Sequence, residues 1–239
     1  MRTHIVVHEA FEAPGALEDW ARSRGHDLSF SRVHEGDALP TSGQDIDLLI
    51  VMGGPQQPTT TVEECPHFDA AAETALISSC IETDRAVIGI CLGAQLVGES
   101  LGAAWAPSPH TEIGSFPVTL TDAGRAHPFL TGFGDSFHTG HWHNDMPGLT
   151  DDATVLATSA GCPRQIIAYS RYVYAFQCHM EFTPDCIEAL IEHDGKELAA
   201  LADRPYVQQP DQLRANDYTG MNARLTTFLD RLTADYTTR

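Results

Sequence analysis

A cysteine between two glycines is the first feature of this sequence that suggests chemistry. Cys91 lies in Gly89-Ile90-Cys91-Leu92-Gly93, after the apolar run 86–90 and before a stretch with helical spacing of apolar residues. A strand, Gly-x-Cys-x-Gly and a helix form the pattern of a nucleophile elbow. The dipole and free N–H groups of a helix N-terminus favour a thiolate. The pattern predicts Cys91 as a nucleophile and the N–H of Leu92 as an oxyanion donor, with a glycine-flanked core cysteine as the alternative.

A cysteine nucleophile needs a base, and the base needs an acid that orients it. Pairs of the form His-x-acid are candidates, because residues two apart face the same side of an extended chain. The sequence contains His67/Asp69, His110/Glu112, His143/Asp145 and His179/Glu181. The last pair closes the strand-like run 172–178, and open α/β sheets carry their sites at strand ends. We therefore predict His179 as the base and Glu181 as its orienting acid.

A glycine pair follows a second buried strand-like run, 46–52. Gly53 and Gly54 present N–H groups without side chains at the end of that run, and Pro55 stiffens the turn. Such a turn is suited to donate a further hydrogen bond to an oxyanion. An ordinary turn between a strand and a loop is the alternative interpretation.

Three histidines of the segment 138–143 raise the alternative of a metal site, because imidazole is a good zinc ligand. His141 and His143 share one face of a regular strand, whereas His138 faces the other way. No fourth ligand accompanies them. The sequence therefore predicts no metal site, and the six cysteines contain no Cys-x-x-Cys pair that would change this.

Strands that alternate with helices must position these residues. The expected strands cover 4–7, 28–33, 46–52 and 86–90, and the expected helices cover 15–24, 66–83 and a stretch from residue 92. This alternation predicts a parallel sheet covered on both sides. Short strand-like runs in the second half predict an antiparallel extension. Helical periodicity returns at 184–202 and 222–235, with an irregular loop at 203–220. We expect one domain, 1–239, in which 185–239 form a helical C-terminal segment.

The charge of the chain limits its partners. Lys plus Arg number 14 against 33 Asp plus Glu, a formal net charge of −19. Such a surface repels phosphate backbones and anionic lipid, so we expect neither nucleic-acid nor membrane binding. The N-terminus does not have the pattern of a signal peptide, and no apolar stretch approaches the length of a membrane span. We expect a reduced, cytoplasmic protein.

Several segments together resemble the class I (triad) glutamine amidotransferases, and closely the free-standing GMP synthase-like group. They occur in the family's order within about residues 46–185 and are MGGP (52–55), GICLGAQ (89–95), EIGSFPV (112–118), HWHND (141–145), RQIIAY (164–169) and HME (179–181). The resemblance implies a flavodoxin-like three-layer sandwich with a mostly parallel central sheet and a short antiparallel extension. The family's common Phe-His-Pro-Glu is replaced here by Cys178-His179-Met180-Glu181.

The resemblance also implies roles. Cys91, His179 and Glu181 would form the triad, Gly53, Gly54 and Leu92 would surround the oxyanion hole, and Gln95 and His143 would lie near the glutamine. The implied reaction is hydrolysis of the γ-amide of glutamine through a γ-glutamyl thioester, without a cofactor. Because no ATP-binding loop or synthetase domain is visible, the ammonia would pass to a separate synthetase or acceptor subunit. A γ-glutamyl peptide or amide hydrolase without an acceptor and a non-catalytic partner-binding protein are the alternatives.

Overall fold

A nine-stranded mixed sheet runs through the computed structural model, which describes all residues 1–239. Its strands are β1 (Arg2–Val7), β2 (Asp27–Arg32), β3 (Leu48–Val51), β4 (Ala86–Ile90), β5 (Ala106–Leu120), β6 (Ser136–Met146), β7 (Thr154–Ser159), β8 (Ile166–Ala168) and β9 (Val173–Phe176). Their order is β2-β1-β3-β4-β9-β8-β7-β5-β6. The first five strands of this order pair in parallel and the remaining pairings are antiparallel, so the antiparallel extension contains four strands.

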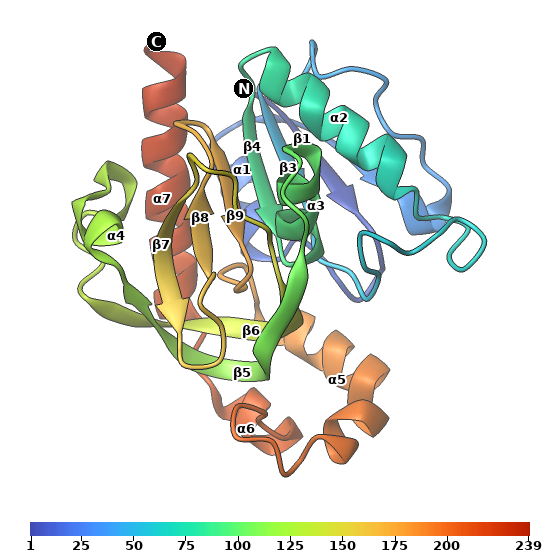
Figure 1. Cartoon of the computed structure of the whole chain (residues 1–239), viewed down its shortest axis with the longest axis vertical. Coiled ribbons are helices and arrows are strands. Elements are labelled where there is room, and N and C mark those ends of the chain that lie inside the picture. The colour runs from blue at the N-terminus through green and yellow to red at the C-terminus, as the bar shows by residue number, and fades with distance from the viewer.

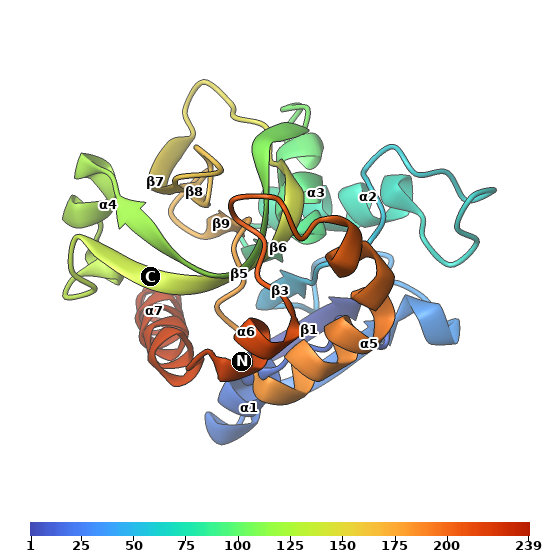
Figure 2. The ribbon, with the colours of Figure 1, turned by 90° about the horizontal axis from the view of Figure 1, so that it is seen from below.

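Helices cover both faces of the parallel strands. They are α1 (Ala16–Ser23), α2 (Ala70–Glu82), α3 (Leu92–Ser100), α4 (Asp122–Ala126), α5 (Pro184–Ala200), α6 (Pro210–Ala215) and α7 (Thr219–Thr237), with 3₁₀ turns η1 (Val33–Glu35) and η2 (Pro128–Leu130). Figure 2 shows α2 and α3 on one side of the parallel strands and α1 and α7 on the other. The three-layer α/β sandwich predicted from the sequence is confirmed.

The alternation of side chains along the parallel strands explains the two helical layers. In β1, Val6 packs into the apolar cluster formed with α2 and α3, whereas Ile5 and Val7 pack into the cluster formed with α1 and α7. Successive residues of a strand point to opposite faces, so a strand that is apolar throughout must be covered on both sides. The continuous apolar runs in the sequence thus correspond to buried strands.

Two predicted boundaries were wrong. The helix expected over 66–83 begins at Ala70, because the Asp69 side chain accepts a hydrogen bond from the Ala72 N–H (3.0 Å) and caps the helix there. The segment 203–220, expected to be an irregular loop, contains α6. This segment carries little apolar periodicity, and the tertiary packing of Leu213 and Tyr218 stabilises the short helix instead.

The helices α5 and α6 lie at the end of the sheet near β5 and β6 (Figure 1). The segment between these helices pairs with β5, since the Ile113 N–H donates to the Tyr206 carbonyl and the Gln208 N–H donates to the Ile113 carbonyl, each at 2.8 Å. Ile113 and Phe182 pack with both helices in a third apolar cluster. This attachment holds α5 beside the carboxyl ends of the parallel strands. None of the chain's helices has the length and apolarity needed to cross a membrane.

Candidate active site

Cys91 occupies the turn between β4 and α3 in a backbone conformation that side chains rarely adopt. Its φ and ψ are 50° and −106°, and it is one of two non-glycine residues with positive φ. A Cβ on Gly93 would collide with the Val51 carbonyl, and a Cβ on Gly89 would collide with the Gly93 carbonyl. The two glycines are therefore needed for the sharp turn that holds the Cys91 thiol at the N-terminus of α3. The geometry is that of the predicted elbow.

His179 and Glu181 meet in the way their spacing predicted. The His179 Nδ1–H donates to Glu181 Oε1 at 2.5 Å, and both side chains are buried. The other ring nitrogen, Nε2, has no hydrogen-bond partner in the chain. Burial lowers the pKa of His179, but Glu181 and the neighbouring Cys91 outweigh burial and raise it well above the usual 6.5. The ring is thus poised to hold a proton next to Cys91.

The His179 ring is fixed by backbone pairing and by stacking. Its backbone N–H and carbonyl pair with the carbonyl and N–H of Gly140, each at 2.8 Å. Its ring stacks on Phe182, with centroids 4.1 Å apart and planes 11° from parallel. A Cβ on Gly140 would contact both the Phe182 ring and the His179 carbonyl. The short segment after β9 is therefore held in place although it belongs to no strand.

Two turns border the Cys91 thiol with backbone N–H groups. Leu92 is the first residue of α3, so its N–H has no partner within the helix. A Cβ on Gly54 would lie 3.0 Å from Leu92 Cδ2, which places the glycine turn beside the start of α3. A Cβ on Gly53 would lie 3.4 Å from Cys91 Cβ and 3.3 Å from His179 Cε1. Gly53 thus lies against Cys91 and the His179 imidazole, and Gly54 lies beside the first residue of α3.

Buried His8, which no motif of the sequence indicated, supports the glycine turn. His8 Nδ1 donates to the Gly53 carbonyl and His8 Nε2 donates to Glu73 Oε2, both at 2.8 Å. Burial lowers the pKa of His8, but the Glu73 charge and both hydrogen bonds raise it above the usual value. His8 directly follows β1, and its place at the carboxyl end of a parallel strand was the one signal that the sequence offered.

One amide side chain contacts the Cys91 thiol, and a second amide contacts the first. Gln177 Nε2 donates to Cys91 Sγ at 3.3 Å, and Gln95 Nε2 donates to Gln177 Oε1 at 3.3 Å. The thiol itself lies 3.8 Å from the carbonyl of Trp142. Gln177 is a further site residue that was not predicted, since an amide between two strand-like residues carries no distinct pattern.

A cavity of about 390 Å³ lies over Cys91. The predicted residues Gly54, Gln95 and His143 line it together with Trp142. Its remaining walls come from the β1–α1 segment, the loop after the glycine turn, β5 and β6, and α5, and they are Phe11, Glu12, Pro55, Gln56, Gln57, Thr60, Thr111, Ile113, Asn144, Asp145, Asp194, Glu197, Leu198 and Leu201. A cavity of this size can hold a small molecule, and Cys91 lies in its wall.

Comparison with known proteins agrees with this geometry. Residues 15–194 match the family described as glutamine amidotransferase class-I. This chain belongs to that family. It is 54% identical over 233 residues to the glutamine amidotransferase-like protein YfeJ of Salmonella typhimurium, covering 98% of each chain. It is also similar to the crystal structure of SMU.1228c, with a TM-score of 0.96, 48% identity and coverage of 98% of this chain and 100% of that one.

A more distant relative shows how far the fold of class-I glutamine amidotransferases extends. The crystal structure of a glutamine amidotransferase from Thermotoga maritima superimposes with a TM-score of 0.84 at 23% identity, covering 97% of each chain. At this identity the likeness concerns the fold alone. The predicted family and the predicted fold are both confirmed.

In this class-I glutamine amidotransferase the other three His-x-acid pairs do not form dyads. His67 Nε2 contacts Glu9 Oε1 at 2.8 Å, while Asp69 caps α2. His110 is exposed and packs on Tyr206, whereas Glu112 is buried away from it. In the third pair, Asp145 accepts a hydrogen bond from Gln57 Nε2 at 3.0 Å instead of contacting the ring of His143. Of the four pairs, only His179/Glu181 joins a ring nitrogen to its acid.

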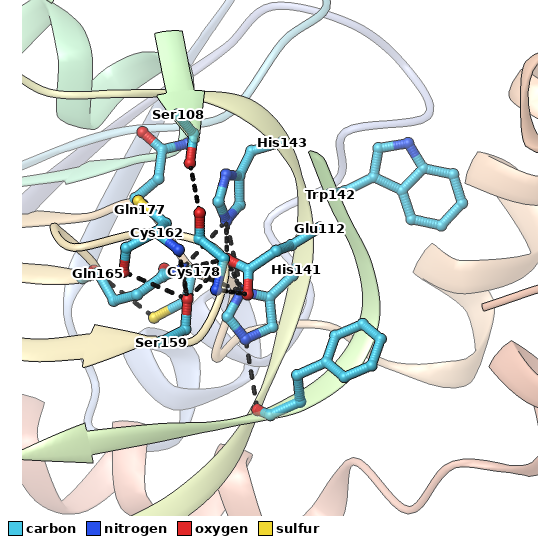
Figure 3. A network of polar contacts seen from close by, with 12 residues as sticks. Ser108, Glu112, His141, Trp142, His143, Ser159, Cys162, Gln165, Gln177 and Cys178 are labelled. Atoms are coloured by element: carbon cyan, nitrogen blue, oxygen red, sulfur yellow. Dashed lines mark hydrogen bonds and ion pairs between the residues drawn. The ribbon is translucent and has the colours of Figure 1, made fainter. Parts of the chain in front are cut away.

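The His-rich strand β6 forms a buried polar network with Glu112, which Figure 3 shows. His143 Nε2 and His141 Nδ1 lie 3.4 and 3.7 Å from Glu112 Oε2, so these three residues have the donor types of a metal site. However, Gln165 Nε2 and Ser159 Oγ each donate to the same carboxylate oxygen at 2.7 Å. Burial lowers the pKa of His141 to about 3, so its ring is neutral. His138 is exposed on the opposite face, as predicted.

This network lies behind the cavity wall and contributes one residue, His143, to its lining. His143 belongs to both, because its side chain lines the cavity while its Nε2 faces Glu112. Burial raises the pKa of Glu112, but its hydrogen bonds with His143 and Ser159 outweigh burial and lower it, so the carboxylate is ionised. An ionised, buried carboxylate with several donors rigidifies its surroundings. The network therefore fixes the part of β6 whose Trp142 carbonyl borders Cys91.

Proposed function

We propose that the chain is a cysteine-dependent glutaminase that hydrolyses the γ-amide of glutamine through a γ-glutamyl thioester on Cys91. One arrangement carries the proposal: the His179–Glu181 pair at 2.5 Å leaves Nε2 of His179 free beside a thiol held in a nucleophile elbow. A nucleophile, a base and an orienting acid in this order are the parts that acyl transfer requires.

The first half of the reaction forms the thioester. The Cys91 thiolate attacks the γ-carbonyl carbon, and the N–H groups of Gly54 and Leu92 stabilise the oxyanion of the tetrahedral intermediate. His179, whose raised pKa keeps it protonated, gives its proton to the departing nitrogen. The carbon–nitrogen bond breaks and the carbon–sulfur bond remains. Gln95 and His143 contact the glutamyl part from the cavity wall.

The second half hydrolyses the thioester. Once sulfur is acylated, the negative charge of Cys91, which raised the pKa of His179, is gone. The ring, which has given its proton to the leaving nitrogen, therefore stays neutral more readily and acts as a general base toward water. Water gives a proton to the ring as it attacks the thioester, the carbon–sulfur bond breaks, and glutamate leaves the restored thiolate–imidazolium pair. These steps use no metal and no organic cofactor.

Two fates of the leaving nitrogen remain as proposals. A separate synthetase or acceptor subunit would take up ammonia, or the enzyme would hydrolyse γ-glutamyl amides without any acceptor. The carboxylates of the cavity favour the second, because they are suited to bind an amine product. A non-catalytic partner-binding protein would have no need for the buried His179–Glu181 pair. We expect the chain to act in the cytoplasm.

The experiment that tests the proposal traps Cys91. The purified chain is treated with a glutamine-like diazo-ketone, and labelled peptides are mapped by mass spectrometry. We expect label on Cys91 alone, and its loss with Cys91→Ser. Cys65→Ser is the matched control, because Cys65 is the one cysteine that is not buried. Label on Cys178 instead would refute the proposal, although burial raises the pKa of that thiol.

A second measurement compares turnover. Free glutamine and γ-glutamyl dipeptides are offered to the isolated chain, and the Cys91 thioester is sought by acid quench of the wild-type chain during turnover. Glutamate release from any of these substrates supports an enzyme that works alone. Inactivity toward all of them, reversed only by adding a cell extract, would support a partner-dependent amidotransferase.

A further inference from the structure

The cavity over Cys91 carries an unusual balance of charges. Four carboxylates line it and no lysine or arginine does. These four residues are Glu12, Asp145, Asp194 and Glu197. A cavity with low-dielectric walls and one sign of charge concentrates ligands of the opposite sign. The cavity is therefore built to receive positive charge.

Three of the four carboxylates are either hydrogen-bonded within the chain or exposed to solvent. Asp145 accepts a hydrogen bond from Gln57, and Asp194 accepts hydrogen bonds from Trp142 Nε1 at 2.7 Å and from its neighbour His193. Glu197 is exposed on α5 at the rim. These three residues contribute to the field of the cavity, but none of them requires a ligand.

Glu12 is different, because it is buried without a partner. Its exposed fraction is 9%, and it forms neither a side-chain hydrogen bond nor an ion pair with the rest of the chain. Buried carboxylates are almost always paired, because an unpaired one loses its hydration without compensation. The pKa of Glu12 is raised above its usual value, because burial and the nearby carboxylate Glu181 outweigh the opposing effect of His179, and a bound cation would restore its charge. Glu12 lines a ligand cavity, so a cationic group of a bound ligand could supply the partner that this carboxylate does not have in the chain.

Glu12 also lies on the side from which the leaving group departs. A Cβ on Gly53 would be 2.8 Å from Glu12 Oε2 and 3.3 Å from His179 Cε1. Both groups therefore border the same small space. His179 gives its proton to the scissile nitrogen, so whatever is attached to that nitrogen must pass beside the imidazole. A positive charge a few bonds beyond the nitrogen is then within reach of Glu12.

We propose that the substrate is a γ-glutamyl amide of an aliphatic diamine, whose free ammonium group binds Glu12. This inference rests on the proposed thioester chemistry and names the leaving group. Cys91 forms a carbon–sulfur bond, the carbon–nitrogen bond breaks, and the diamine leaves with the proton from His179. Water then cleaves the thioester, so one amide and one water become glutamate and a free diamine.

The test uses three amides that differ only in the charge of the leaving group. They are the γ-glutamyl amides of 1,3-diaminopropane, of butylamine, which replaces the ammonium by a methyl group, and of β-alanine, which carries a carboxylate. We expect kcat/KM for the diamine amide to exceed that for the butyl amide by roughly tenfold to hundredfold, the usual value of a charged hydrogen bond. The β-alanine amide should be the poorest of the three.

A substitution assigns this preference to Glu12. Glu12→Gln removes the charge and keeps the shape, so the ratio of kcat/KM between the diamine and butyl amides should collapse toward one. The control is Glu192→Gln on the exposed side of α5, which should keep the wild-type ratio. A wild-type ratio near or below one, or an unchanged ratio in Glu12→Gln, would overturn the inference while leaving the thioester chemistry intact.

A binding measurement keeps the test independent of turnover and of the Glu12 substitution. Cys91→Ala is titrated calorimetrically with the diamine amide and the butyl amide, and tighter binding of the diamine amide is expected. Equal affinity would overturn the inference. If the wild-type chain hydrolyses none of the three amides and Cys91 forms no thioester, the proposed function fails together with this inference.

Discussion

Glu181 accepts the hydrogen bond from Nδ1 of His179, and this contact leaves Nε2 as the only ring nitrogen free for proton transfer. The pairing selects the tautomer and the orientation of the ring, because a carboxylate at one nitrogen directs the other toward the reacting groups. Both residues are buried, so water does not compete for the contact. The pair therefore sets the direction in which the proton moves.

Replacing His179 should remove proton transfer. We expect His179→Ala to lower kcat by roughly 10²–10⁴-fold, the usual contribution of general acid–base catalysis. Glu181→Gln should lower kcat by a smaller factor. Because Glu181 raises the pKa of His179, this substitution should also shift the alkaline limb of the pH profile of thioester formation to lower pH. Rapid-quench kinetics across pH measure both effects. His110→Ala is the control, and a larger loss there than in His179→Ala would contradict the assignment.

The elbow should not accept a side chain at Gly93. A methyl group there would collide with the Val51 carbonyl, so Gly93→Ala should destabilise the fold by about 1–3 kcal/mol or more. Gly195→Ala is the matched control, because Gly195 lies inside α5 with open space around it. This substitution should raise the free energy of unfolding by roughly 0.5–1 kcal/mol. Urea unfolding measures both. Equal stability of the two variants would show that the elbow relaxes freely.

The network around Glu112 should hold no metal. Its carboxylate oxygen Oε2 already accepts hydrogen bonds from Ser159 and Gln165, so it does not need a cation to compensate its burial. We expect purified protein to contain no stoichiometric zinc and chelators to leave its activity unchanged. Elemental analysis checks this. About one zinc per chain, lost in a His141→Ala/His143→Ala double variant, would overturn the prediction.

Acid should destabilise the fold through buried neutral histidines. Burial lowers the pKa of His4 from 6.5 to about 4, so between these pH values the unfolded chain binds a proton that the folded chain does not. The free energy of unfolding therefore falls as the pH falls through this window, by at most about 1.4 kcal/mol per pH unit for this residue. His4→Gln should reduce that slope in urea unfolding between pH 7 and pH 5. An unchanged slope would exclude His4 as a contributor.

Local patterns of the sequence are enough to predict the strands, the elbow and the His179–Glu181 pair. The apolar runs predict buried strands because a strand covered on both faces has no polar side, and Gly-x-Cys-x-Gly predicts the elbow because only glycines fit beside its turn. The spacing of His179 and Glu181 predicts their contact, since residues two apart in extended chain share a side. Such patterns do not predict where α2 begins. A single capping contact of Asp69 starts this helix at Ala70.

The remaining site residues are brought together by the folding of the whole chain. His8 and Glu12 follow β1, Glu73 lies in α2 and Gln177 follows β9, and none of them belongs to a motif. They meet because parallel strands direct their carboxyl ends to one edge of the sheet, which joins segments far apart in the sequence. The same packing buries Glu12 without a partner and places it in the wall of the cavity, and only this position suggests that it binds a cation. Burial and pairing are properties of the folded chain, so no local pattern encodes them.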